Sequence, residues 1–468
     1  MTNTKSKPIV GAALRGCPAI VCCIVLLAAT MSFATLARVE SMGKRSAFFL
    51  DDVSMFDNPA NATFYPNALI GELGFYRMNS LGYKDVGNMR DPSLVDPLSP
   101  WFGALFRYGL SDDGLRDPQI TIGGFFGRDH NEFQRFVPRE VDVGGRTYRV
   151  PSNVTNFDAF LAGTMIDGSA VGAHIYVAVQ DGKEDDVLNN DPSKGEMASN
   201  AHVSILAMDY GANFLITNSS SMEVSLGIAR IQYGPSRKTF LDPGLFSFYS
   251  QGRLFLEMDA WNGQFVTGYK IADMEVPGWE ETSYGLNAGI NKIIPRGLFW
   301  FGLDAIFVQE TVSTWGLRQD ERGNDILFYR EPLYREQIKS DRGNTFGGAI
   351  SFGIERNVFK DWLVLRTGGM KSFAYKTCTI NSDRSLDGSD NRSTICKTPN
   401  GQTGKGNYWA TNPIGDGSLD DHLGLGIGIN LENKLKIDAT VAEDALLRNP
   451  FVNGPGRIIS RVSAMYTF

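Results

Sequence analysis

The sequence lacks a long apolar segment beyond its N-terminal region: no run of 18 or more apolar residues follows residue 29. This absence excludes a later membrane-spanning helix, which needs about 20 predominantly apolar residues. The mean hydropathy of −0.16 also argues against a helical membrane protein. It does not exclude a transmembrane β-barrel, because lipid-facing and lumen-facing residues alternate along each strand and their average looks soluble.

The sequence is also poor in the motifs of catalysis. Its four histidines, His130, His174, His202 and His422, are scattered along the chain. None belongs to an HExxH zinc motif, and neither a Walker loop nor a GxSxG motif is present. Barrel proteases and phospholipases need histidine with carboxylate or serine at one rim. The sequence therefore predicts no enzymatic activity and no cofactor.

Two segments, residues 181–191 and 381–391, are rich in the oxygen ligands that calcium prefers. Neither has the spacing of an EF-hand loop. The simpler interpretation is that both are solvated outer loops, so no metal site is predicted.

Cysteine is scarce, and three of the five residues, Cys17, Cys22 and Cys23, lie near the N-terminus without the surroundings of a lipoprotein site. The other two, Cys378 and Cys396, flank a polar segment, which in an exported protein predicts a disulfide. A loop of this size would contribute about 3 kcal/mol in the chain-entropy treatment. A pair of free thiols is the alternative.

The N-terminus is typical of a secretory signal peptide. Lys5, Lys7 and Arg15 precede an apolar core at residues 18–29. Cleavage is predicted after Ala34 or Ala37, with the second preferred, so residues 1–37 are the predicted signal peptide. Its removal lowers the 45 basic residues to 42 against 52 acidic ones, a net charge of −10. This charge argues against nucleic-acid partners.

The last twelve residues alternate with period 2. Phe468, Tyr466, Ala464 and Val462 fall on one face, and Arg461 falls on the other. An aromatic residue at the end of such a strand is typical of the closing strand of a Gram-negative outer-membrane barrel. The pattern predicts that Tyr466 and Phe468 face lipid and serve as a signal for the barrel-assembly machinery. An edge strand of a soluble sandwich is the alternative.

Sixteen segments of strand length, this last one included, follow from the same alternation and from turn residues. They are residues 68–77, 101–110, 119–128, 157–167, 170–180, 201–216, 222–233, 250–261, 265–273, 282–293, 298–309, 344–356, 362–375, 422–432, 435–444 and 457–468. The connections between them alternate between short and long. Counted back from a periplasmic C-terminus, every short connection falls on the periplasmic side, as expected for a transmembrane barrel.

Charged residues on the polar faces of these strands are predicted to point into the lumen, because unpaired charge facing lipid costs about 2–4 kcal/mol. The predicted lumen-facing charges are Glu257, Asp259, Asp304, Arg366, Lys436, Asp438 and Arg461. They form either a polar conduction path or a salt-bridge lattice that supports the barrel. The sequence leaves both interpretations open.

Residues 38–67 are not strand-like and are predicted to enter the lumen as a plug-like segment. Within them, Asn58-Pro59-Ala60 follows an export signal and precedes a barrel. This arrangement resembles FadL-type long-chain fatty acid transporters, in which an Asn-Pro-Ala segment plugs the lumen. The resemblance implies uptake of hydrophobic solutes and assigns these three residues to the plug. The family has fourteen strands, whereas sixteen are predicted here, and the predicted inner faces are more polar and glycine-rich than a fatty-acid path suggests.

The sequence thus predicts an all-β fold: a closed antiparallel transmembrane β-barrel of 14–16 strands, formed by residues 68–468, with an N-terminal plug-like segment. The predicted location is the outer membrane, in contact with its lipid. The predicted function is passive uptake of small solutes, hydrophobic ones among them, through a channel or transporter. The alternatives are a structural or binding barrel that uses the disulfide-pinned loop 376–421, and an exported soluble β-domain.

Overall fold

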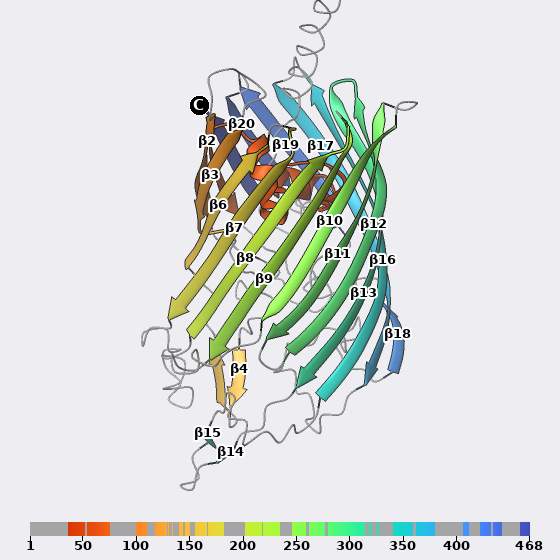
Figure 1. Ribbon diagram of the computed structural model, residues 1–468. Helices are drawn as coiled ribbons and strands as arrows, with labels where there is room; N and C mark the ends of the chain where they lie inside the picture. Colours follow the sequence, from red (N-terminus) through yellow and green to blue (C-terminus); the bar gives the residue numbers. More distant parts are fainter. Residues whose placement is uncertain are drawn as a thin grey trace, which may run out of the picture.

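The protein is described by a computed structural model (Figure 1). The described residues are 36–51, 54–74, 100–109, 118–128, 130, 133, 140–143, 146–149, 155–165, 167–181, 202–217, 219–234, 246–258, 262–276, 279–313, 318–319, 325–326, 340–358, 362–379, 406–410, 422–431, 434–441 and 459–468.

The described strands form one large antiparallel sheet that closes on itself. Its strands are β1 (Ala68–Gly74), β2 (Trp101–Gly109), β3 (Gln119–Phe126), β6 (Thr155–Thr164), β7 (Ala170–Asp181), β8 (His202–Leu215), β9 (Ser221–Gly234), β10 (Ser247–Met258), β11 (Gly263–Val276), β12 (Trp279–Ile294), β13 (Gly297–Ser313), β16 (Ser340–Val358), β17 (Leu363–Thr379), β18 (Gly406–Ala410), β19 (His422–Leu431), β20 (Leu435–Val441) and β21 (Ile459–Thr467).

Neighbours in this ring are neighbours in the chain, and β1 pairs with β21 to close it. The sheet contains 17 strands, but β18 and β19 both pair with β17, along different parts of its length. The ring therefore has sixteen positions, and each of the sixteen predicted segments overlaps one of them. The prediction of a closed antiparallel barrel is confirmed.

The outer face of the ring is apolar. Leu286, Phe102 and Leu226 are 67%, 65% and 58% exposed and lie on three different strands. Their chain neighbours point inward, because successive side chains of a strand alternate between its two faces. An exposed apolar belt around a ring without a free edge is the arrangement that hydrocarbon requires. The chain is a transmembrane β-barrel.

Among the described residues, no helix has the length and apolar character needed to cross a bilayer.

Two small hairpins lie outside the ring, β4–β5 (Glu140–Val143 and Arg146–Arg149) and β14–β15 (Arg318–Gln319 and Asp325–Ile326). Both fall in connections that were predicted to be long, residues 129–156 and 310–343. Figure 1 places them at the end of the barrel opposite the C-terminus. The end that carries the C-terminus has short connections, such as the two-residue turn between β12 and β13, where Arg296 has a φ of 62°.

The N-terminal segment, defined here as residues 36–51 and 54–65, lies inside the ring, near the end that carries the C-terminus (Figure 1). It contains α2 (Leu36–Ser41), η1 (Ser46–Phe48), α3 (Ser54–Asp57) and η2 (Pro59–Phe64). After α2, Gly43 and Lys44 take left-handed conformations, with φ of 93° and 65°, and reverse the chain. A non-glycine residue would be strained at the first of these positions, which also lies against the wall.

Most of the predicted signal peptide, residues 1–35, lies outside the described residues, so the boundary after Ala37 stays a prediction. The helix α2 begins at Leu36, and the Thr440 hydroxyl donates to the carbonyl oxygen of Ala37 at 2.7 Å. Only cleavage at the other predicted site, after Ala34, would keep this contact.

Candidate functional site

The N-terminal segment rests on inward-facing glycines of the wall. A Cβ atom added to Gly368 of β17 would lie 2.3 Å from the backbone carbonyl carbon of Met42. Across the lumen, a Cβ on Gly172 of β7 would lie 2.5 Å from that of Pro59. Contacts this short with backbone cannot be relieved by rotating a side chain. The glycine-rich inner faces are therefore the seat of the segment.

The Asn58-Pro59-Ala60 motif lies against β7 and β8. The Asn58 side chain caps η2, because its Oδ1 accepts the N–H of Ala60 at 3.1 Å, and its Nδ2 donates to the carbonyl oxygen of Ala212 at 3.1 Å. Pro59 occupies the first position of η2, where the missing N–H costs nothing. The motif thus joins the segment to the wall, and its role as a plug remains a proposal.

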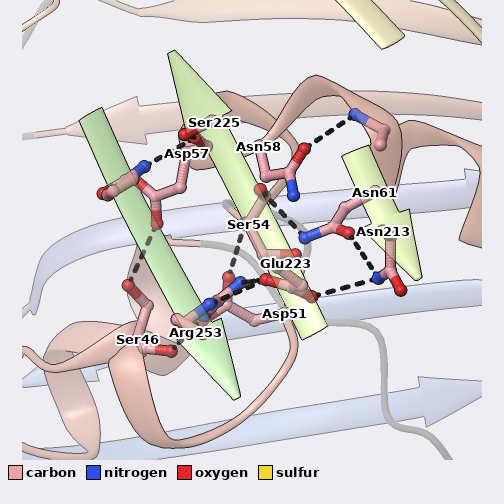
Figure 2. Close-up of polar contacts among 12 residues, drawn as sticks. Ser46, Asp51, Ser54, Asp57, Asn58, Asn61, Asn213, Glu223, Ser225 and Arg253 are labelled. Carbon is pink, nitrogen blue, oxygen red and sulfur yellow. Dashed lines mark hydrogen bonds and ion pairs between the residues drawn. The ribbon is translucent and has the colours of Figure 1, made fainter. Parts of the chain in front are cut away.

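Polar bonds from β9 and β10 hold the middle of the segment (Figure 2). Arg253 donates from Nε to Glu223 Oε2 at 2.8 Å and from Nη1 to the carbonyl oxygen of Ser46 at 3.0 Å. The Ser225 hydroxyl donates to the carbonyl oxygen of Asp57 at 2.9 Å. These bonds tie backbone carbonyl groups of the segment to side chains of the wall.

Asp51 lies between η1 and α3 and is 2% exposed. Its Oδ1 accepts the N–H of Ser54 at 2.9 Å, at the start of α3. Burial raises the pKa of the Asp51 carboxyl to about 7; Asp57 adds to this effect, and the guanidinium groups of Arg38 and Arg253 oppose it. Asp51 is therefore a carboxyl group that titrates near neutral pH.

A buried chain of ion pairs joins α2 to three strands. Arg38 donates from Nε to Glu355 Oε2 of β16 at 2.7 Å, and Arg366 of β17 donates to the same oxygen. Arg366 also donates from Nη1 to Asp438 Oδ1 of β20 at 2.5 Å. All four side chains are buried. Each buried charge has a hydrogen-bonded partner of opposite sign, which is what its removal from water requires.

Two more of the predicted lumen-facing charges bind the segment. Asp304 of β13 forms an ion pair with Arg45. Arg461 of β21 forms ion pairs with Glu72 of β1 and with Glu40 of α2. With Arg366 and Asp438, four of the seven predicted residues therefore lie in ion pairs on the inner face.

The other three predicted charges are Glu257, Lys436 and Asp259. Glu257 is exposed and accepts a hydrogen bond from Ser219 at the short-connection end of β10. Lys436 is half-buried on β20. Asp259 lies outside the described residues.

An aromatic pocket surrounds Phe56 of α3. The rings of Trp101, Phe125 and Phe160, from β2, β3 and β6, meet it edge-to-face at centroid distances of 6.1, 5.4 and 5.3 Å. The guanidinium carbon of Arg128 lies 3.8 Å from the centroid of the same ring. Phe56 thus anchors the segment to the part of the wall that the ion-pair chain does not reach.

A second polar network lies beside this pocket. His174 of β7 places its ring nitrogens 2.7 Å from Asp209 Oδ2 and 2.8 Å from Asp158 Oδ1. Arg128 pairs with Asp158 at 2.6 Å, and the Tyr249 hydroxyl donates to Asp209. These bonds link β6, β7, β8 and β10. Sequence reasoning treated His174 as an isolated histidine, although the strand register places it directly opposite Asp209.

Beyond this network, toward the long-connection end, the inner face of β7–β11 carries an apolar cluster. The inner apolar wall, as defined here, consists of Tyr176, Ala178, Ile205, Ala207, Ala229, Ile231, Ala272 and Met274, with Tyr249 packed against it. Along β7, Tyr176 and Ala178 follow His174 and pair with Ala207 and Ile205 of β8. Alternation predicts polar residues on the inner face of a water-filled barrel, so this wall departs from the expected pattern.

Phe133 covers the inner apolar wall from the connection between β3 and β6. Its ring is 1% exposed and lies 5.7 Å from that of Tyr249. The His130 ring stacks on it at a centroid distance of 3.9 Å. Burial and the neighbouring Arg128 lower the pKa of His130 well below its usual value, so the ring is neutral at physiological pH. Phe133 and His130 therefore present an apolar face to the wall.

Four predicted site residues remain: the two cysteines of the predicted disulfide and the two aromatic residues at the C-terminus. Cys378 is disulfide-bonded, and Cys396 lies outside the described residues, so their pairing stays a prediction. Tyr466 and Phe468 are 44% and 56% exposed on the outer face. Their role in membrane assembly also stays a prediction.

No protein-family model and no curated protein matches the sequence. Solved structures of similar fold include the toluene transporter TodX of Pseudomonas putida, with 12% identity and a TM-score of 0.33 over 93% of this chain and 98% of that one. A FadL homologue of Pseudomonas aeruginosa has 10% identity and a TM-score of 0.32 over the same shares. A bacterial polysaccharide outer-membrane secretin has 9% identity and a TM-score of 0.38, over 86% and 97%. Because these values are low, function is inferred from this chain's own residues.

Proposed function

We propose that the chain is an outer-membrane transporter for the passive uptake of small hydrophobic solutes. This proposal rests on the inner apolar wall. Ile205, Ile231 and Met274 on the inner face do not favour the passage of ions or sugars. Apolar side chains offer a hydrated solute no hydrogen bonds in place of those it makes with water. A hydrophobic solute is instead stabilised there by about 25 cal/mol for each Å² of apolar surface that leaves water.

The N-terminal segment acts in this proposal as the plug of the periplasmic end. Its contacts with strands all around the ring, from Ala212 of β8 to Glu355 of β16, support that role. The ion pairs of Asp304, Arg366, Asp438 and Arg461 support the salt-bridge lattice rather than the polar conduction path, because each of these charges is occupied by a partner. Phe133 covers the wall and would have to move when a solute binds.

The test compares inner and outer faces of the same strand. Ile205→Ser places a hydroxyl on the inner apolar wall, whereas Leu206→Ser, its matched control, places one on the lipid face. Uptake of radiolabelled dodecanoate by intact cells carrying the wild-type protein should exceed uptake by cells without it. We expect Ile205→Ser, alone or with Ile231→Ser, to reduce the protein-dependent part several-fold, and Leu206→Ser to leave it within twofold.

Two results would contradict the proposal. One is unchanged dodecanoate uptake in the Ile205→Ser and Ile231→Ser double variant, with the variant present as a folded band of wild-type intensity. The other is rapid swelling of proteoliposomes in sucrose with the wild-type protein, which would indicate an open polar channel instead.

A further inference from the structure

The ring is closed by the pairing of β1 with β21, which is called the seam here. Of all strand pairings in the ring, this one costs the most chain entropy. Seven residue pairs join β1 and β21, from Ala68 with Thr467 to Gly74 with Arg461. Every other pair of neighbouring strands is joined by a much shorter connection. Bringing distant strands together costs more chain entropy than forming a hairpin. The seam is therefore where additional contacts have the largest effect on closure.

On the inner side of the seam, one arginine holds three elements together. Arg461 of β21 contacts Glu72 Oε1 of β1 through Nη1 and lies 2.9 Å from Glu40 Oε1 of α2 through Nη2. The indole of Trp101 on β2 donates to the same Glu72 oxygen at 3.1 Å. Arg461, Glu72 and Trp101 are all buried. A charge-assisted hydrogen bond in such a place is roughly twice as strong as a neutral one.

Apolar contacts cross the seam four residues further along β21, where Met465 pairs with Ile70. Met465 of β21 and Ile70 of β1 belong to one buried cluster with Met55, Phe56 and Tyr65 of the N-terminal segment. This cluster continues onto β2, β3 and β6.

The segment also holds strands on both sides of the seam. Its helix α2 packs on β17, β19, β20 and β21, whereas η2 packs on β3, β6, β7 and β8. Because α2 and η2 belong to one short stretch of chain, the two sides cannot separate without breaking contacts with one of them.

We infer that the N-terminal segment is a clasp that holds β1 and β21 together, in addition to any role as a stopper. The segment runs directly into β1, since Tyr65 is three residues before Ala68, and Glu40 reaches from its other end to β21. A stopper needs only to fill the lumen and would stabilise all parts of the wall alike. A clasp stabilises the seam more than the rest of the ring.

The chain offers a matched pair of ion pairs for the test. Glu40 binds the seam, and its side chain is 22% exposed; Arg45 binds Asp304 on β13, and its side chain is 21% exposed. Glu40→Ala removes one partner of Arg461 and leaves Glu72 in place. Arg45→Ala removes a comparable ion pair on a part of the wall distant from the seam in strand order. Both side chains belong to the segment, so general loosening of the segment affects both variants.

The measurement is hydrogen–deuterium exchange of the full-length mature protein in detergent micelles, read by peptide mass for β1, β21, β12 and β13. In Glu40→Ala, we expect exchange in β1 and β21 to rise by about tenfold and exchange in β12 and β13 to remain as in the wild type. In Arg45→Ala, exchange in β1 and β21 should not change. The inference is overturned if Glu40→Ala leaves the seam strands as slow as in the wild type. It is equally overturned if Arg45→Ala speeds them as much as Glu40→Ala does.

Discussion

Replacing Asp51 by asparagine should remove a pH dependence from the stability of the barrel. In the unfolded chain this carboxyl ionises near its ordinary pKa of 3.8, whereas burial in the folded chain raises the pKa to about 7. Between these two values the folded state binds the additional proton. Stability should therefore be highest below about pH 4 and fall as the pH rises toward 7, as far as this group is concerned.

The size of the effect follows from the shift. Each pKa unit corresponds to about 1.4 kcal/mol, so a shift of about three units gives roughly 4 kcal/mol of lost stability above pH 7. The asparagine side chain would keep the shape of the aspartate and an oxygen that accepts the Ser54 N–H, but it carries no charge at any pH. The Asp51→Asn variant should therefore be the more stable protein at pH 8 and close to the wild type at pH 4.

The assay is urea unfolding of the purified protein in detergent micelles between pH 4 and pH 8, followed by the gel mobility of the folded band. Only the difference between wild type and variant is interpreted, because other titrating groups contribute equally to both. A difference that stays constant from pH 4 to pH 8 would refute the assignment of a neutral-range pKa to Asp51. A wild type that gains stability relative to the variant as the pH rises would refute its sign.

Three further substitutions test the packing directly. Arg366→Met leaves Glu355 and Asp438 buried with fewer partners and should lower the free energy of unfolding by roughly 3–5 kcal/mol, measured by the urea midpoint. Phe56→Ala empties the aromatic pocket and should cost about 3–5 kcal/mol in the same assay, with faster proteolysis of the N-terminal segment. Leu286→Arg puts a charge on the lipid face and should cost about 2–4 kcal/mol, seen as a smaller folded fraction after refolding into vesicles.

Strand number and strand direction could be predicted because they depend on local pattern. Leu423, Leu425 and Ile427 alternate with glycines, and this alternation alone places β19 on the barrel and its leucines toward lipid. The alternation between short and long connections then predicts which end of the barrel is periplasmic and which is extracellular. The predicted bounds were wrong mainly at the long-connection ends, where β13, β16 and β17 extend several residues beyond the predicted segments. There the strands carry polar residues on both faces, so hydrophobic alternation gives no signal.

The partners of the inner-face residues could not be predicted, because they depend on contacts between distant parts of the chain. Arg38 and Glu355 are separated by 317 residues, and nothing near either of them indicates the other. The predicted inner faces were noted as rich in glycine. A glycine in a strand indicates that another part of the chain or a ligand approaches closely, but it does not indicate which one. The inner apolar wall was missed for a related reason: Ala207 and Ala229 look like ordinary small residues until the ring places them beside Tyr176.

The inward-facing glycines beneath the N-terminal segment also determine how a barrel without that segment would behave. The wall beneath Met42 and Pro59 has no side chains with which to fill the vacated space, since Gly368 and Gly172 carry none. The result would be an opening bordered by charges that have lost a partner, such as Asp304 without Arg45, and such an opening would admit water and polar solutes. If the segment acts as the proposed plug, carrying it on the same polypeptide as the ring provides one copy for each barrel and closes such a leak.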